Sequence, residues 1–141
     1  LFEIVTFAHS LGIVHGCINP TNFLINPETH GGMLIDWCYS VNSGKPIQII
    51  ATPNESDYPP EVRTRHNATR RTDTYMIGKT LLHLADSTCQ SSITGFLKSI
   101  SIAPYAYRPS NTQSLMLKFK AIQFGLFGSP HFHPFSMYPN L

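Results

Sequence analysis

Apolar residues recur at the three- and four-residue spacing of an amphipathic helix in several stretches of the chain. Gly12 and Gly125 stand where helix stops are expected, and Pro109 suits a first helical turn. The predicted helices cover residues 1–11, a segment that begins with Thr72 and Asp73 as capping residues, residues 93–100, and residues 109–125. The pattern therefore favours a mostly helical chain.

Short β-like runs lie between the first two helices. Turn residues separate them, with Asn26-Pro27 and Gly31-Gly32 between the second run and the third. Residues 38–60 are rich in Ser, Asn, Pro and Gly and keep no period, which indicates a long loop. We expect small paired strands that flank a loop, formed by Ile13–Val14, Phe23–Ile25 and Met33–Ile35.

Composition limits the classes of partner. Charged residues make up 13% of the 141 residues, about half of the ~25% in ordinary soluble domains, so a partner or a missing lobe is expected to cover part of the surface. A formal net charge of +2, with clustering only among Arg63, Arg65, Arg70 and Arg71, gives no case for nucleic acid. No apolar run approaches the ~20 residues of a membrane span, so no membrane association is expected.

The cysteines indicate a reducing compartment. Cys17, Cys38 and Cys89 do not form an even disulfide set, and none of them pairs at CxxC spacing. The apolar start of the chain lacks the basic leader of a signal peptide and leads directly into expected core. We therefore expect a cytoplasmic protein whose sequence begins inside a folded unit.

A polar loop between short strands carries the candidate chemistry. The chain reads HGCINPTN from His15 to Asn22, and Asp36 follows an apolar strand. Asn and Asp supply the hard oxygen ligands that Mg²⁺ prefers, and substrate phosphates usually complete its coordination. Asn22 and Asp36 are equally consistent with ordinary turn residues, so both interpretations stay open on these residues alone.

The order of several motifs resembles the protein-kinase family. The run HGCINPTN resembles the catalytic loop HRDLKPEN, and Asp36-Trp37-Cys38 resembles the metal-binding DFG. Further matches are Pro59-Pro60-Glu61 with APE, residues 73–78 with D-x-W/Y-x-x-G, and Arg108-Pro109-Ser110 with RP-S. The resemblance implies an α+β, mostly helical C-terminal lobe over residues 1–126, with short β-hairpins at the catalytic and metal loops. Residues 127–141 would follow as an aromatic and proline-rich segment.

The resemblance also implies structural roles that do not depend on catalysis. His15 is expected to be a packed residue of the loop, and Asp73 to accept hydrogen bonds from backbone amides near His15 and Gly16. Glu61 is expected to form a partly buried ion pair with Arg108, which would anchor the end of the long loop to the helices.

The catalytic positions depart from the family pattern. Cys17 stands in place of the catalytic Asp, Asn19 in place of the Lys, and Gly16 in place of the Arg. Asn22 and Asp36 remain as metal ligands, yet the printed sequence contains no glycine-rich phosphate loop and no VAIK-like lysine. The sequence therefore predicts a pseudokinase module that binds Mg²⁺ and ATP weakly or not at all. Its expected role is binding or scaffolding with a protein partner or a missing N-lobe.

Two enzyme interpretations remain as alternatives. One is a divergent ATP-dependent phosphotransferase whose N-lobe lies upstream. The other rests on HG and LIDW, which also resemble small-molecule kinases of the aminoglycoside phosphotransferase type. That second family ranks lower because its members lack the PPE and D-x-Y-x-x-G patterns, and Cys17 replaces the base there as well.

Overall fold

The computed structural model describes residues 1–131, apart from the side chains of residues 52–54. Most of the predicted C-terminal segment, residues 132–141, lies outside the described part. The helices are α1 (Phe2–Ser10), α2 (Pro60–Arg63), α3 (Arg70–Leu84), α4 (Ser91–Ser101) and α5 (Thr112–Phe127). The strands are β1 (Ile13–Val14), β2 (Phe23–Ile25), β3 (Gly32–Leu34) and β4 (Val41–Asn42).

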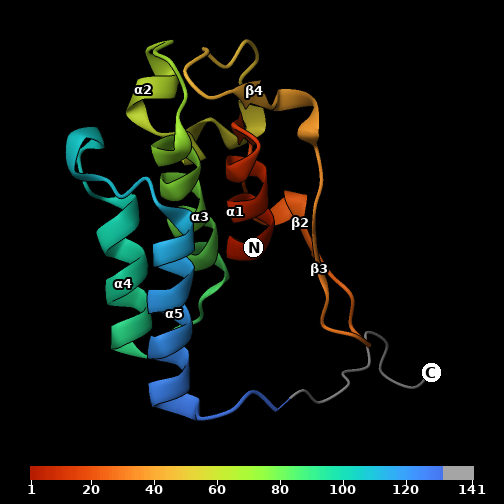
Figure 1. Ribbon diagram of the computed structural model, residues 1–141, viewed down its shortest axis with the longest axis vertical. Coiled ribbons are helices and arrows are strands. Elements are labelled where there is room, and N and C mark those ends of the chain that lie inside the picture. The colour runs from red at the N-terminus through yellow and green to blue at the C-terminus, as the bar shows by residue number, and fades with distance from the viewer. Residues whose placement is uncertain (132–141) are drawn as a thin grey trace.

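Helix α3 is the centre of the helical part of the molecule. It packs against α4, while α1 packs against α5, and the strands lie to the side of these helices (Figure 1). Each fully buried aliphatic side chain stabilises the fold by about 1.5–3 kcal/mol. No helix in the described part combines the length and apolarity needed to cross a bilayer. The fully buried apolar side chains include Val5, Val14, Ile18, Met76, Ile77, Leu97 and Ile100.

The close approach of α3 and α4 depends on Gly78. A Cβ atom at this position would lie 2.9 Å from the backbone oxygen of Leu97 and 2.9 Å from Cβ of Ser101. Real Cβ atoms do not approach other atoms so closely, so a side chain here would push the two helices apart. Gly78 is therefore a packing residue of this helix pair.

Two small antiparallel sheets flank the polar loop of residues 15–22. β1 pairs with β4, and β2 pairs with β3 in a register that places Phe23 opposite Leu34. The sequence predicted β1 and β2 and placed β3 one residue late. It did not predict β4, because a two-residue strand within a Ser- and Asn-rich stretch shows no alternation of apolar and polar residues.

Some predicted helix boundaries are wrong. The N-cap of α3 is Thr69 rather than Thr72 or Asp73, and Thr72 completes a capping box with it. Helix α5 begins at Thr112, after the N-cap Asn111, and not at Pro109. It also continues through Gly125 and ends before Gly128, which has a φ of 72°. Nothing lies within 4 Å of a Cβ built at Gly125, so that glycine is an exposed helix residue and not a stop.

Candidate functional site

The buried carboxylate of Asp73 holds the polar loop in place. Its Oδ2 accepts hydrogen bonds from the backbone N of His15 at 2.8 Å and from Nε2 of His9 at 2.9 Å, while Oδ1 accepts one from the backbone N of Gly16 at 2.9 Å. The predicted contact between Asp73 and the loop is therefore confirmed. The sequence analysis missed His9, which also hydrogen bonds to Thr112 and so links α1, α3 and α5. The sequence signal for His9 was weak, because it consisted of its place beside Ala8 on the predicted apolar helix face.

His15 ties the loop to the end of β3. The fully buried ring donates from Nε2 to the backbone oxygen of Ile35 at 2.9 Å, and Nδ1 accepts from the backbone N of Cys17 at 3.2 Å. Its edge packs against Trp37 with 4.6 Å between ring centroids. Burial lowers the pKa of His15, although Asp73, the bond to Ile35 and Asp36 oppose this effect. The ring is therefore a packed structural residue, as the sequence predicted, and its lowered pKa favours the neutral form.

Cys17 is a buried, protonated thiol. Only 1% of the residue is exposed, and the side-chain amide of Asn22 donates to its backbone oxygen at 2.9 Å. Burial raises the pKa of the Cys17 thiol, and the hydrogen bond with Tyr58 only partly offsets this. A thiol with a raised pKa holds its proton near neutral pH. It is therefore not a general base at this position.

The side chain of Asn19 serves the backbone of the loop. Its Oδ1 accepts from the backbone N of Thr21 at 2.9 Å and of Asn22 at 3.2 Å, which caps the short 3-10 turn Pro20–Asn22. The Thr21 hydroxyl donates to the same oxygen at 2.6 Å. A lysine has no acceptor and could not make these bonds. Asn19 is therefore a turn-capping residue.

Asn22 and Asp36 lie at the same end of the β2–β3 hairpin. The backbone N of Ile35 donates to the oxygen of Asn22 at 2.9 Å, which closes this end. Asp36 is exposed and adopts the left-handed region, with φ 64° and ψ 44°, which is uncommon for a non-glycine residue. Neither the Asp36 carboxylate nor Oδ1 of Asn22 has a hydrogen-bond partner within residues 1–131.

These free oxygens fit the chemistry of a magnesium ion that keeps several waters and takes its remaining ligands from phosphates. No group of three His, Cys, Asp or Glu side chains suited to a metal occurs in the described part of the chain. The free oxygens of Asn22 and Asp36 are the ligands that this site could offer to Mg²⁺. When bound, the ion would supply charge neutralisation for phosphate groups.

Glu61 and Arg108 form the predicted ion pair. Nη1 of Arg108 lies 2.6 Å from Oε1 of Glu61, and the two side chains are 2% and 10% exposed, respectively. The same Nη1 donates to the backbone oxygen of Arg71 at 3.1 Å, and the guanidinium lies over the Tyr75 ring at 4.7 Å. The pair thus anchors the end of the long loop to α3, as predicted.

The fold is similar to that of a protein of known structure. No protein-family model matches the sequence. ROP2 from Toxoplasma gondii, described as a virulence factor with a protein-kinase fold and no enzymatic activity, has a similar structure, with a TM-score of 0.58 and 16% sequence identity. The similarity covers 86% of this chain and 42% of the ROP2 chain.

The chain has a protein-kinase-like fold. It is mostly helical with small antiparallel sheets, so the predicted fold class is confirmed. The chain spans less than half of the length of ROP2. Its fold corresponds to a kinase-like C-lobe. The division of the chain at residue 126 stays a prediction.

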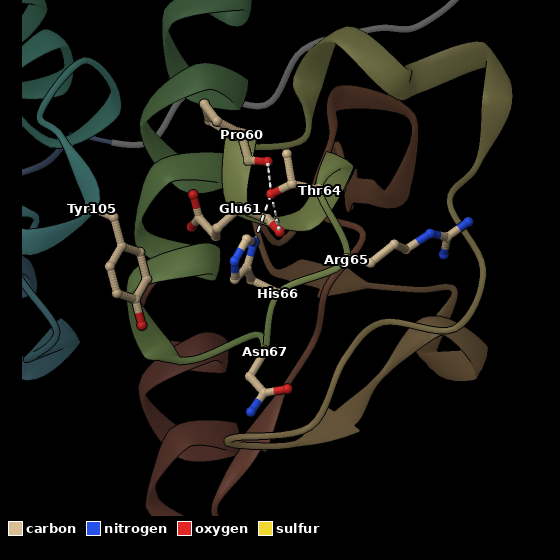
Figure 2. Close-up of a pocket in the computed structure, with 7 residues that line it drawn as sticks. All are labelled: Pro60, Glu61, Thr64, Arg65, His66, Asn67 and Tyr105. Carbon is tan, nitrogen blue, oxygen red and sulfur yellow. Dashed lines mark hydrogen bonds between the residues drawn. The ribbon is translucent and has the colours of Figure 1, made fainter.

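A cavity of about 620 Å³ opens near the anchored end of the long loop in this kinase-like lobe. Figure 2 shows Tyr105 on one side of it, with the carboxylate of Glu61 facing that ring. The cavity does not include Cys17, Asn22 or Asp36. It is therefore separate from the catalytic-loop-like residues. Its lining consists of Pro60, Glu61, Thr64, Arg65, His66, Asn67 and Tyr105.

Tyr58 is a further site residue that the sequence analysis missed. It is fully buried, its hydroxyl accepts from the backbone N of Ala51 at 3.2 Å, and it also hydrogen bonds with Cys17. Burial and the contact with Cys17 strongly raise the pKa of Tyr58. A tyrosine within a polar loop gave no sign that it would be buried against residue 17, because this contact depends on how the loop folds back.

Proposed function

We propose that this chain is a catalytically impaired, kinase-like module, a pseudokinase, that acts by binding or scaffolding another protein. The proposal rests mainly on Cys17, which stands in the position of the catalytic base and is a buried thiol with a raised pKa. A general base must come within about 2.6–3.2 Å of the proton that it accepts, directly or through one water. Cys17 meets neither the chemical nor the steric requirement, because it holds its own proton and lies against Tyr58.

The phosphate side of the site is weakened as well. Phosphoryl transfer depends mainly on positioning and on charge stabilisation of the phosphates. Asn19 has no positive charge, and its carbonyl oxygen is already used by the Pro20–Asn22 turn. Mg²⁺ and ATP are therefore expected to bind weakly or not at all, through Asn22 and Asp36.

An exposed apolar surface on the β2–β3 hairpin supports a binding role. Leu24 and Met33 are cross-strand partners, so their side chains share one face of the hairpin, and both are exposed. Trp37 follows at the end of this hairpin and is also exposed. Neighbouring exposed apolar residues mark interaction surfaces. A protein partner or an N-lobe is the expected occupant.

A divergent phosphotransferase remains the second candidate. It is favoured by the free oxygens of Asn22 and Asp36 and by the left-handed backbone of Asp36, because such conformations often occur at functional sites. In this candidate an N-lobe, on the same chain or on another, would position the nucleotide for transfer.

A paired binding and transfer assay separates the two candidates. We expect calorimetric titration with Mg²⁺ and ATP to give weak heats or none, and labelled ATP to transfer no phosphate to a generic protein acceptor or to an aminoglycoside. Asp36→Ala is the informative variant. Glu28→Ala is its matched control, because it removes another exposed carboxylate outside the site. Transfer by the unmodified chain that Asp36→Ala abolishes and Glu28→Ala preserves would overturn the pseudokinase proposal.

A further inference from the structure

The C-terminal end of α5 carries a mostly apolar cavity that the other described helices leave open. Figure 1 shows this end extending past α1 and α4, the helices that pack against α5. Phe124 and Phe127 are accordingly 64% and 61% exposed, and their three-residue spacing places both rings on one face of the helix. The cavity at this face has a volume of about 500 Å³. Its lining consists of Lys120, Gln123, Phe124, Phe127, Gly128 and Pro130.

The chain itself leads from α5 along this cavity. Gly128 ends the helix with a φ of 72°, and its backbone N donates to the oxygen of Phe124 at 2.8 Å. Pro130 already forms part of the cavity wall. Residues 132–141 therefore begin beside the cavity, where a tethered segment has an effective concentration of about millimolar. A segment of the same chain thus has an advantage over any separate molecule that could bind there.

Residues 132–141 also have a composition that suits an apolar cavity. They contain no Lys, Arg, Asp or Glu, whereas segments that stay solvated are rich in charge and poor in aromatic residues. Pro134 and Pro139 disfavour a regular helix or a central strand, so side-chain packing is the main contact available to this segment. The large apolar residues are Phe132, Phe135, Met137, Tyr138 and Leu141.

The reach of the chain selects one anchor among these residues. Phe132 follows Pro130 too closely for the chain to reverse between them, because a β-turn takes four residues. Phe135 comes after a stretch long enough for such a turn, and it is the first large apolar residue that does. Its ring would meet Phe124 and Phe127, and aromatic rings favour contact with one another.

We propose that residues 132–141 fold back onto the C-terminal end of α5, with the ring of Phe135 in the cavity beside Phe124 and Phe127. Docking of this segment does not depend on Cys17 or on the phosphate side of the site, so it goes beyond the proposed function. It would keep the end of α5 from protein partners. The β2–β3 hairpin would then remain as the apolar surface that a partner can reach.

Proteolysis of the full chain tests the docked segment. Chymotrypsin cleaves after Phe135, and mass spectrometry gives the rate of this cleavage in the full chain and in a synthetic peptide of residues 128–141. A docked segment is cleaved only in the fraction of molecules in which it is open. We therefore expect cleavage after Phe135 to be at least about tenfold slower in the full chain than in the peptide.

Two substitutions in α5 identify the surface that protects the segment. Phe124→Ser should raise the rate of cleavage to within about twofold of the peptide rate, because it removes one wall of the cavity. Leu117→Ser is the matched control and should leave the rate unchanged, because Leu117 is 57% exposed on the same helix but does not line the cavity. Urea unfolding of both variants shows whether each keeps its fold.

A substitution in the segment tests the contact from the other side and leaves α5 intact. Phe135→Ser should raise hydrogen exchange of the backbone amides in the last turn of α5 several-fold, because these amides lose the cover of the segment. Ser136→Ala is the control for this variant and should leave the exchange unchanged, because it replaces a small neighbour of the anchor. This measurement decides the matter even if Phe124→Ser does not fold.

Three results would each overturn the docked segment. The first is cleavage of the unmodified chain at the peptide rate. The second is unchanged hydrogen exchange in Phe135→Ser. The third is protection that disappears on about hundredfold dilution, because only binding between molecules depends on concentration, and the cavity would then belong to a second copy of the chain. None of these results bears on phosphate transfer, so the proposed function fails only in its own assay.

Discussion

At the scale of single residues, Gly16, Cys17 and Asn19 of the catalytic-loop-like segment are parts of the local structure. Gly16 provides the space for Ile47, Cys17 is packed beneath Tyr58, and the oxygen of Asn19 caps a turn. Placing the arginine, aspartate or lysine of the kinase catalytic loop at the corresponding one of these positions would remove a contact that the fold uses. Under the proposed function, phosphate transfer would therefore require several changes together.

The buried His15 ring is expected to make the stability of the fold depend on pH. Burial lowers its pKa below the ordinary value of about 6.5, so the unfolded chain takes up a proton at a pH where folded His15 stays neutral. The contribution is favourable above about pH 6.5 and is lost as the pH falls below it. His15→Gln should therefore reduce the loss of stability between pH 7.5 and about 5.5, measured by urea unfolding at each pH.

The control for this measurement is His83→Gln, because His83 is an exposed histidine of α3. It should leave the slope of stability against pH as in the unmodified chain. The comparison uses the slope rather than the absolute stability, because loss of the His15 ring also removes its contact with Trp37. An equal slope in the chain with and without His15 would contradict the assigned neutral state.

At the scale of elements, local periodicity located most of the structure but not its boundaries. The apolar runs gave the strands β1, β2 and β3 and the interiors of α1, α3, α4 and α5. The caps were misplaced where several capping residues follow one another, as in Thr69 and Thr72, because only one of them can take the extended N-cap conformation. Helix α2 was missed because its four residues are too few to show a period.

Gly78 and Gly95 lie in the helix pair α3 and α4, and we expect alanine at the two positions to have opposite effects on the free energy of unfolding. Gly78→Ala should lower the free energy of unfolding by about 1–3 kcal/mol, because its Cβ would lie 2.9 Å from backbone and side-chain atoms of α4. Gly95→Ala should raise it by about 0.5–1 kcal/mol, because nothing lies within 4 Å of its Cβ and alanine favours the helix. Urea unfolding measures both. Equal effects of the two substitutions would show that the helices do not pack as described.

At the scale of the whole molecule, ordered motifs predicted more of the site than any local pattern could. They gave the contact of Asp73 with the loop, 57 and 58 residues away along the chain, and the pair of Glu61 with Arg108. They did not give His9, Ile47 or Tyr58, because each of these is defined by tertiary packing. An apolar residue in a polar loop shows its role only when the loop has folded onto the lobe.

The buried ion pair between Glu61 and Arg108 joins the long loop to the helices. Arg108→Met should lower the free energy of unfolding by about 3–5 kcal/mol, because it leaves the Glu61 carboxylate buried without its partner. Adding Glu61→Leu should recover part of this loss by removing that carboxylate. The recovery is partial, because the hydrogen bond from Arg108 to the backbone oxygen of Arg71 is lost in both variants.

An exposed ion pair of the same length provides the control. Nζ of Lys120 lies 2.6 Å from Oε1 of Glu3, as close as the atoms of the buried pair, but these side chains are 55% and 70% exposed. Lys120→Met should therefore cost no more than about 1 kcal/mol. Urea unfolding of the three variants and of the unmodified chain gives the comparison directly. If Arg108→Met costs as little as Lys120→Met, then burial does not strengthen the pair, and the loop is not anchored to the lobe through Glu61.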